Sequence, residues 1–183
     1  TIIASTPASA QTYAWTVGYD STLLPILPTL EKETDCLVRV SNVATPAQLD
    51  TSNAAFTIKS KLQIIAPDGG NLWYVGDTNR NITWSKWGNF DTTVKLQYSV
   101  DAPHAVWTDV TGATALLASA GSFSWNPIPI AASGTTVKVR VISNTNADVL
   151  DASNADFEIR GTITLTAPVS TSQWPNGYPQ TIA

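Results

Sequence analysis

The chain contains one histidine, one cysteine and no methionine, so few side chains could carry out acid–base, nucleophilic or metal chemistry. His104 follows Pro103 in an expected loop, and Asp101 and Asp109 are the carboxylates nearest to it in sequence. No nucleophile motif accompanies a His–Asp pair here, so we expect His104 to lie in a solvated turn and not in an active site. A single His and a single Cys also fall short of a closed four-ligand zinc site. We therefore expect no enzymatic activity and no resident cofactor.

Calcium is the one ion that the sequence makes a candidate. Asp50 and Asp151 each begin an Asp-x-Ser-Asn turn, and Asp148 precedes the second turn closely. Clustered carboxylate and amide oxygens are the ligands that Ca²⁺ binds. The alternative, which we favour, is an Asx turn in which the carboxylate accepts a hydrogen bond from the backbone two residues on.

Seven tryptophans are present, and their places in the sequence suggest two uses. Trp84 and Trp125 fall on expected core strands, and packing within or between domains is the interpretation we favour for most of the others. Trp87 and Trp107 are less constrained by the strand pattern and could instead stack on sugar rings. Asn81 begins an N-glycosylation sequon, but it lies within an expected strand.

An apolar, proline-punctuated stretch near the start of the chain is a candidate interface. Its large apolar residues include Leu23, Leu24, Ile26 and Leu27. Proline blocks regular strand pairing, so this stretch is expected to form a loop or an edge segment. Because an apolar loop of a soluble protein is usually covered by a neighbour, we expect it to pack on an adjoining domain or another chain. The alternative is a loop folded over its own domain.

An internal repeat organises these residues. Residues 49–58 (LDTSNAAFTI) return as residues 150–159 (LDASNADFEI), with seven of ten positions identical at an offset of 101. The same offset aligns further short matches: VRV at 38–40 with VRV at 139–141, Ala-Pro at 66–67 with Ala-Pro at 167–168, Trp73 with Trp174, and Gly76 with Gly177. One repeat is therefore about 100 residues long, the size of a small β-sandwich domain.

The complete copy of the repeat has the pattern of an all-β domain. Thr and Val are abundant, no sustained helical periodicity occurs, and residues 94–100 alternate apolar and polar side chains. Seven short strands are expected, at residues 62–64, 81–84, 94–100, 105–108, 122–125, 137–141 and 155–159. Seven short strands in about 100 residues predict a seven-stranded, immunoglobulin-like or fibronectin-III-like β-sandwich.

The frame of the repeat predicts the domain organisation. Residues 1–60 hold the C-terminal part of one Ig-like repeat, residues 61–160 a complete repeat, and residues 161–183 the first strand of a further repeat. This is the pattern expected of a window cut from a tandem array. In this frame Cys36 aligns with Val137, so we expect it to be a small core residue and not a reactive thiol.

Several motifs of the complete copy resemble a known family. They are Ala-Pro-Asp-Gly-Gly at 66–70 with Trp73 and Gly76, Ile-Thr-Trp at 82–84, VKLQYS at 94–99, Trp107, Phe-x-Trp at 123–125, and KVRV at 138–141. Together they look like the Ser/Thr-rich cell-wall-anchored repeat family, whose domains occur in tandem in large microbial surface proteins. The resemblance implies a β-sandwich with a structural or cell-surface role and no catalytic residues to carry over.

Charge and hydropathy narrow the function further. Ten basic and 14 acidic residues give a net charge of −4, which argues against a nucleic-acid binder. Hydrophobic residues make up 43% of the chain, enough for a core, yet no apolar run approaches the length of a membrane span. We expect a structural segment of a long extracellular protein at the cell surface, such as a surface layer, sheath, stalk or fibre. Its expected partners are neighbouring repeats and like chains.

Two alternatives belong to other functional classes. The first is a carbohydrate-binding or adhesive module that contacts cell-wall or surface glycans through Trp87 and Trp107. The second is a hydrolase whose catalytic domain lies outside these residues. Binding of glycans by the isolated chain would favour the first, and activity of the isolated chain would favour the second.

Overall fold

The computed structural model describes residues 2, 5–17, 32–88 and 92–183. Strands are the main regular elements, and the described helices are the three-residue 3₁₀ turns η1 (Ala8–Ala10), η2 (Ala118–Ala120) and η3 (Ile130–Ala132). The prediction of an all-β chain is therefore confirmed. No helix in these ranges is both long enough and apolar enough to cross a membrane.

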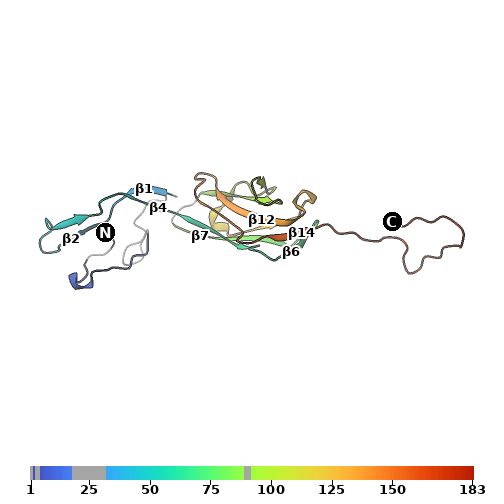
Figure 1. Ribbon diagram of the computed structural model, residues 1–183, viewed down its shortest axis with the longest axis horizontal. Helices are drawn as coiled ribbons and strands as arrows, with labels where there is room; N and C mark the ends of the chain where they lie inside the picture. The colour runs from blue at the N-terminus through green and yellow to red at the C-terminus, as the bar shows by residue number, and fades with distance from the viewer. Residues whose placement is uncertain (1, 3–4, 18–31, 89–91) are drawn as a thin grey trace.

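The middle of the chain, residues 61–160, contains most of the strands. In chain order they are β5 (Lys61–Ala66), β6 (Leu72–Tyr74), β7 (Arg80–Trp87), β8 (Thr93–Ser99), β9 (Thr108–Asp109), β10 (Leu116–Leu117), β11 (Ser122–Trp125), β12 (Gly134–Ser143), β13 (Leu150–Ala152) and β14 (Phe157–Arg160). One sheet has the order β11-β7-β5, and the other has the order β10-β8-β12-β14-β6, with β9 beside β8 and β13 beside β12. Strands β7 and β12 lie in opposite layers (Figure 1).

The two sheets share one hydrophobic core. Strand β12 alternates buried and half-buried residues, so that Val137, Val139 and Val141 all face the core. Aromatic rings connect the layers at one end of this core. The ring of Trp125 on β11 lies 5.1 Å from that of Tyr98 on β8 and 6.4 Å, edge-on, from that of Trp73 on β6.

The segment before the sandwich forms two small sheets. Strand β1 (Lys32–Cys36) pairs with β4 (Phe56–Lys59), and β2 (Arg39–Ser41) pairs with β3 (Leu49–Thr51). These strands lie at one end of the molecule, as Figure 1 shows. Every buried hydrophobic residue in the described part of the chain nevertheless lies between positions 62 and 159, within the sandwich.

The N-terminal strands reproduce the register of β12, β13 and β14. Val40 is paired with Asp50 in the first segment, and Val141 is paired with Asp151 in the sandwich. Cys36 and Phe56 face each other in the β1–β4 ladder, which also contains a register shift between Glu33 and Cys36. Their counterparts at the offset of 101, residues 137 and 157, form the same pair next to the same shift. The repeat seen in the sequence is thus a repeat of hydrogen-bonded pairing.

Residues 161–183 form no helix or strand, and the chain leaves the sandwich at the end opposite β1 and β2 (Figure 1). One backbone feature matches the complete copy, because Gly76 and Gly177 both adopt a φ of +86°. Such a left-handed conformation suits glycine, which has no Cβ. The expected first strand of a further repeat forms no ladder with the sandwich, and its backbone instead makes hydrogen bonds within the tail, between Ala167 and Ala183 at 2.9 and 3.2 Å.

The strand prediction was mostly correct in place and incomplete in number. Strands β5, β7, β8, β11, β12 and β14 overlap predicted segments. The predicted strand at 105–108 is found at Thr108–Asp109, while β6, β10 and β13 were missed. The missed strands have only two or three residues, too few for an alternating pattern to stand out.

Candidate functional site

The junction between the N-terminal strands and the sandwich is tight. Strand β4 ends at Lys59 and β5 begins at Lys61, so Ser60 alone connects them. Ser60 is buried, and a Cβ added at Gly88 would lie only 2.4 Å from the Ser60 Oγ atom. Gly88 also has a φ of +106°. A side chain at position 88 would collide with Ser60, and the backbone conformation there is unfavourable for a residue with a Cβ, so glycine is required.

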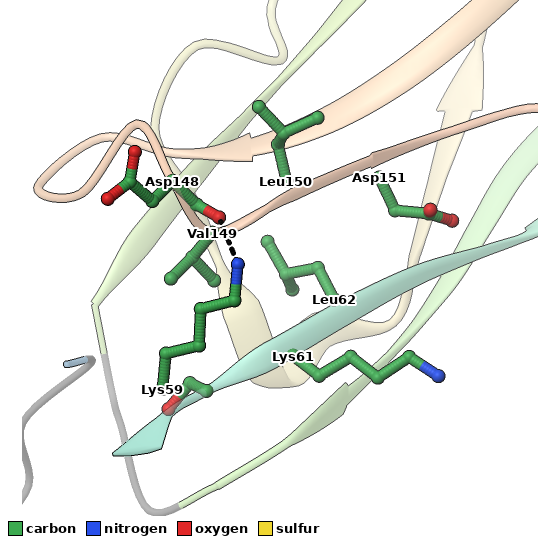
Figure 2. A pocket seen from close by; sticks show the side chains of 8 residues that line it. Lys59, Lys61, Leu62, Asp148, Val149, Leu150 and Asp151 are labelled. Carbon is green, nitrogen blue, oxygen red and sulfur yellow. Dashed lines mark hydrogen bonds between the residues drawn. The ribbon is translucent and has the colours of Figure 1, made fainter. Parts of the chain in front are cut away.

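A charged contact connects the two parts across this junction. The ammonium group of Lys32 lies 2.5 Å from the Asp148 carboxylate, and the ammonium group of Lys59 donates to the Asp148 backbone carbonyl at 3.4 Å. Figure 2 shows Lys59 reaching toward the backbone of Asp148. Both residues line a hollow of about 270 Å³, which Lys61 and Asp151 also line. The hydrogen bond and positive charge of Lys32 hold the pKa of Asp148 below its ordinary value. Because both side chains remain partly exposed to solvent, the ion pair adds little to stability.

Asp151 and Ser153 join β13 to the opposite sheet. The Asp151 carboxylate accepts a hydrogen bond from the backbone N–H of Ile64 on β5 at 2.8 Å. The buried Ser153 hydroxyl donates to the carbonyl of Pro67 at 2.8 Å and accepts from the N–H of Val139 at 3.2 Å. The Asp-x-Ser motif of the repeat therefore connects the two layers of the sandwich.

The favoured Asx-turn interpretation of this motif needs correction. The partner of the Asp151 carboxylate is Ile64 on another strand, and not the backbone two residues on. In the N-terminal copy Ser52 makes the hydrogen bond that corresponds to Ser153–Val139, because its hydroxyl accepts from the N–H of Val38 at 3.2 Å. Asp50 lies on the exposed strand β3, opposite Val40.

The calcium hypothesis gains no cluster of ligands from these positions. Asp148 and Asp151 line the same hollow, but Lys32 occupies the first carboxylate and the Ile64 N–H occupies the second. Among the described residues, no three His, Cys, Asp or Glu side chains group closely enough to hold a metal ion. Calcium binding stays a prediction that titration of the protein with the ion would test.

The two candidate sugar-stacking residues lie on different sheets. Trp87 ends β7, is 49% exposed, and has the Lys61 ammonium group 4.9 Å from its ring centroid. Trp107 precedes β9, is half-buried, and has the Arg140 guanidinium 4.3 Å from its ring centroid. The two rings therefore do not form one flat platform, and each has a cation near its ring.

Arg140 belongs to a polar network on the outer face of the β8–β12 sheet. Its Nε donates to the side chain of Gln97 at 2.8 Å, and the Gln97 amide donates to the Asp109 carboxylate at 2.6 Å. Lys95 approaches the same carboxylate at 3.6 Å. Partial burial lowers the pKa of Arg140, and the charge of Asp109 opposes that shift.

His104 differs from the solvated turn that the sequence suggested. Its side chain is only 12% exposed, and its Nε2 lies 2.9 Å from the Asp156 carboxylate in the turn before β14. The backbone at His104 has a φ of +63°, which is uncommon for a residue with a side chain. Asp101 and Asp109, the carboxylates considered from sequence, contact Ser99 and Gln97 instead. The His104–Asp156 contact connects the loop after β8 with the turn before β14.

The remaining candidates are distributed over separate places. Trp84 and Trp125 are core residues as predicted, and the Trp84 indole N–H donates to the Ala118 carbonyl at 2.9 Å. Asn81 is exposed on β7, opposite Ser124. Cys36 is half-buried and has a free thiol, so it is less enclosed than predicted. The interface candidates Leu23, Leu24, Ile26 and Leu27 lie outside the described residues.

The sequence analysis gave no role to Lys32 or Gly88, and neither has a signal that could have identified it. It placed Ser153 in the repeated Asp-x-Ser-Asn motif, but not its hydrogen bond to Pro67 on the other sheet. No protein-family model, no curated protein and no solved structure matches the chain. The likeness to the Ser/Thr-rich cell-wall-anchored repeats therefore rests on the sequence motifs alone.

Proposed function

We propose that this chain is a non-enzymatic structural segment of a long extracellular tandem-repeat protein, in which each unit is an Ig-like β-sandwich of about 100 residues. The observation that carries the proposal is the repeated pairing. Val40–Asp50 and Val141–Asp151 occupy equivalent ladder positions at the sequence offset of 101. A unit that recurs in both sequence and register is the signature of an array of like domains.

The junction supports a stiff arrangement of such units. One residue, Ser60, separates β4 from β5, and the Lys32–Asp148 contact adds a second connection between the two parts. At the next boundary β14 ends at Arg160 and Gly161 takes the place of Ser60. Short connections with contacts across them restrict the relative motion of neighbouring domains. Stiff, closely spaced domains suit a stalk, sheath, fibre or surface layer.

Exposure at the cell surface is the feature of this proposal that is most readily tested. Lysines with exposed side chains, such as Lys59 and Lys61, are accessible to a membrane-impermeant amine reagent. We expect intact source cells to incorporate the reagent into this polypeptide as fully as lysed cells do. We also expect the denatured native polypeptide to have a mass several times that of one repeat. Labelling only after lysis, or a native mass near that of this chain, would contradict the proposal.

Glycan binding is a second candidate function, and the exposure of Trp87 favours it. A tryptophan ring that remains 49% exposed at the end of a strand offers one face to a sugar. Trp107 would form a separate contact, because it belongs to the other sheet. The cations Lys61 and Arg140 beside these rings would suit acidic sugars.

Titration with cell-wall polysaccharide, monitored by tryptophan fluorescence, distinguishes these two functions. Glycan binding predicts a shift that Trp87→Ala or Trp107→Ala abolishes, while Val106→Ala, at an exposed position, leaves it unchanged. A purely structural role predicts no shift for any of the proteins. Circular dichroism of each variant checks that the sandwich remains folded.

A further inference from the structure

The N-terminal strands expose a face whose counterpart is the core of the sandwich. Val40 is 67% exposed, whereas Val141 at the equivalent ladder position is 0% exposed. Phe56 and Phe157 show the same contrast, at 37% and 1%. We call the face formed by Val38, Val40, Phe56 and Ile58 the open face. An apolar face of this kind is a place where another segment binds.

The complete copy shows which elements cover such a face. Strand β5 lies across β12 and β13, with the side chains of Leu62 and Ile64 in the core. Strand β6 pairs in parallel with β14, placing Trp73 beside Ile159. In the described part of the chain β4, the counterpart of β14, pairs only with β1. Among the described strands none pairs with its other edge, which could therefore accept a strand of the β6 type.

The segment at the other end of the chain has the sequence of these covering strands. At the offset of 101, Leu62, Ile64 and Trp73 correspond to Ile163, Leu165 and Trp174. Ile163 is fully exposed, and Leu165 is 63% exposed. The chain therefore exposes both halves of an interaction that it completes once within itself.

Pro175 is compatible with strand addition at this edge. It occupies the position of Tyr74, and a proline cannot donate a ladder hydrogen bond. In β6 the N–H of Tyr74 does not serve β14, because it donates to the Asp77 carboxylate at 3.0 Å. The counterpart of Asp77 is Tyr178, which has no carboxylate. The tail therefore lacks both the backbone N–H that Tyr74 supplies in β6 and the Asp77 carboxylate that accepts its hydrogen bond.

The N-terminal strands and the C-terminal tail lie at opposite ends of the sandwich, as Figure 1 shows. The tail is therefore placed to bind the open face of a second copy of the chain. We propose that residues 162–168 and 172–177 of one copy bind the open face of another, in the register that β5 and β6 adopt on β12–β14. The turn between them must differ from residues 69–70, because Ser170 replaces Gly69, where a Cβ would lie 2.6 Å from that of Ala155. In this pairing the Leu165 N–H donates to Asp50, the Ser52 hydroxyl donates to the Pro168 carbonyl, and Trp174 lies beside Ile58. A head-to-tail contact of this type produces linear assemblies. The proposal does not depend on an extracellular role: it concerns residues 1–183 as a separate chain, and in a longer tandem polypeptide the same contacts would form between consecutive segments of one chain.

Complementary blocking variants test this pairing. Ile163→Asp combined with Leu165→Asp blocks the tail, and Val40→Asp blocks the open face. All three positions are exposed, so the sandwich should remain folded in both variants. Leu117→Asp is the matched control, because Leu117 is 56% exposed but belongs to neither surface. Sedimentation velocity over a wide concentration range, in reducing buffer because of Cys36, gives the oligomeric state.

We expect the unmodified chain and Leu117→Asp to form concentration-dependent chains, and each blocked variant to remain monomeric. A mixture of the two blocked variants should form a one-to-one heterodimer, because one retains the open face and the other retains the tail. An unmodified chain that stays monomeric would overturn the proposal. Assembly of either blocked variant by itself, or a mixture that stays monomeric, would overturn it as well.

Discussion

The same ladder occurs twice in this chain, once inside a core and once at the surface. Strands β12, β13 and β14 and strands β1 to β4 share their register, their irregularity and their serine hydrogen bond to a valine N–H. They differ in what lies opposite, because among the described strands β5 and β7 lie opposite the first set and no sheet lies opposite the second. Local sequence is therefore sufficient for strand pairing, while burial of the apolar face requires the opposing sheet.

The largest expected contrast comes from removing the equivalent phenylalanine in each copy. Phe157 is 1% exposed and its ring lies 5.1 Å from that of Trp73, whereas Phe56 is 37% exposed. Phe157→Ala should lower the free energy of unfolding of the sandwich by about 3–5 kcal/mol, because it leaves a cavity. Phe56→Ala should lower it by less than about 1 kcal/mol. Urea unfolding monitored by tryptophan fluorescence measures both, and equal losses would contradict the contrast.

The repeated serine should give a smaller contrast in the same direction. Ser153→Ala removes the donor to the Pro67 carbonyl and the acceptor of the Val139 N–H, both in a buried setting. A loss of about 1–3 kcal/mol is expected, because the remaining groups stay unpaired. Ser52→Ala removes an exposed hydrogen bond to Val38, and the backbone can bond to water instead. A cost for Ser52→Ala as large as that for Ser153→Ala would show that the N-terminal ladder is already enclosed.

The junction contact should have the smallest effect, visible in a pKa. Lys32 lowers the pKa of Asp148 below its ordinary 3.8, so the contact is fully present above that pH and is lost as the pH falls through the lowered value. Lys32→Ala should raise the pKa of Asp148 toward 3.8, and Lys138→Ala should leave it unchanged. An NMR titration of the Asp148 carboxyl carbon measures this value. An identical pKa in all three proteins would mean that the contact does not form in solution.

Much of this architecture could be predicted from the sequence because its signal is local or repeated. Alternation at 94–100 identified β8, and the repeated segments at 139–141 and 150–159 contain parts of β12 and β14, which were predicted before any pairing was known. Very short strands such as β10 give no comparable signal, since two residues cannot show a period. Their pairing depends on the neighbouring β8 strand.

The candidate contacts were harder to predict because they connect residues far apart in sequence. His104 pairs with Asp156, 52 positions away, and Lys32 contacts Asp148, 116 positions away. Asp101 and Asp109 were considered for His104 because they are close along the chain, but proximity in sequence does not determine which strands become neighbours. Asp151 was interpreted as a local turn for the same reason, and its partner is Ile64 on the opposite sheet.

The central claim is that residues 32–59 are the second half of the sandwich unit seen complete at 61–160. Amide hydrogen exchange at Val38 and Ser52 tests it most directly, measured in dilute solution for this chain and for a chain with a second copy of residues 61–133 joined before Lys32. We predict fast exchange in the first, and in the second slow exchange that approaches the rates of Val139 and Ser153. Exchange at Val38 and Ser52 that is equally fast in both chains would contradict the claim.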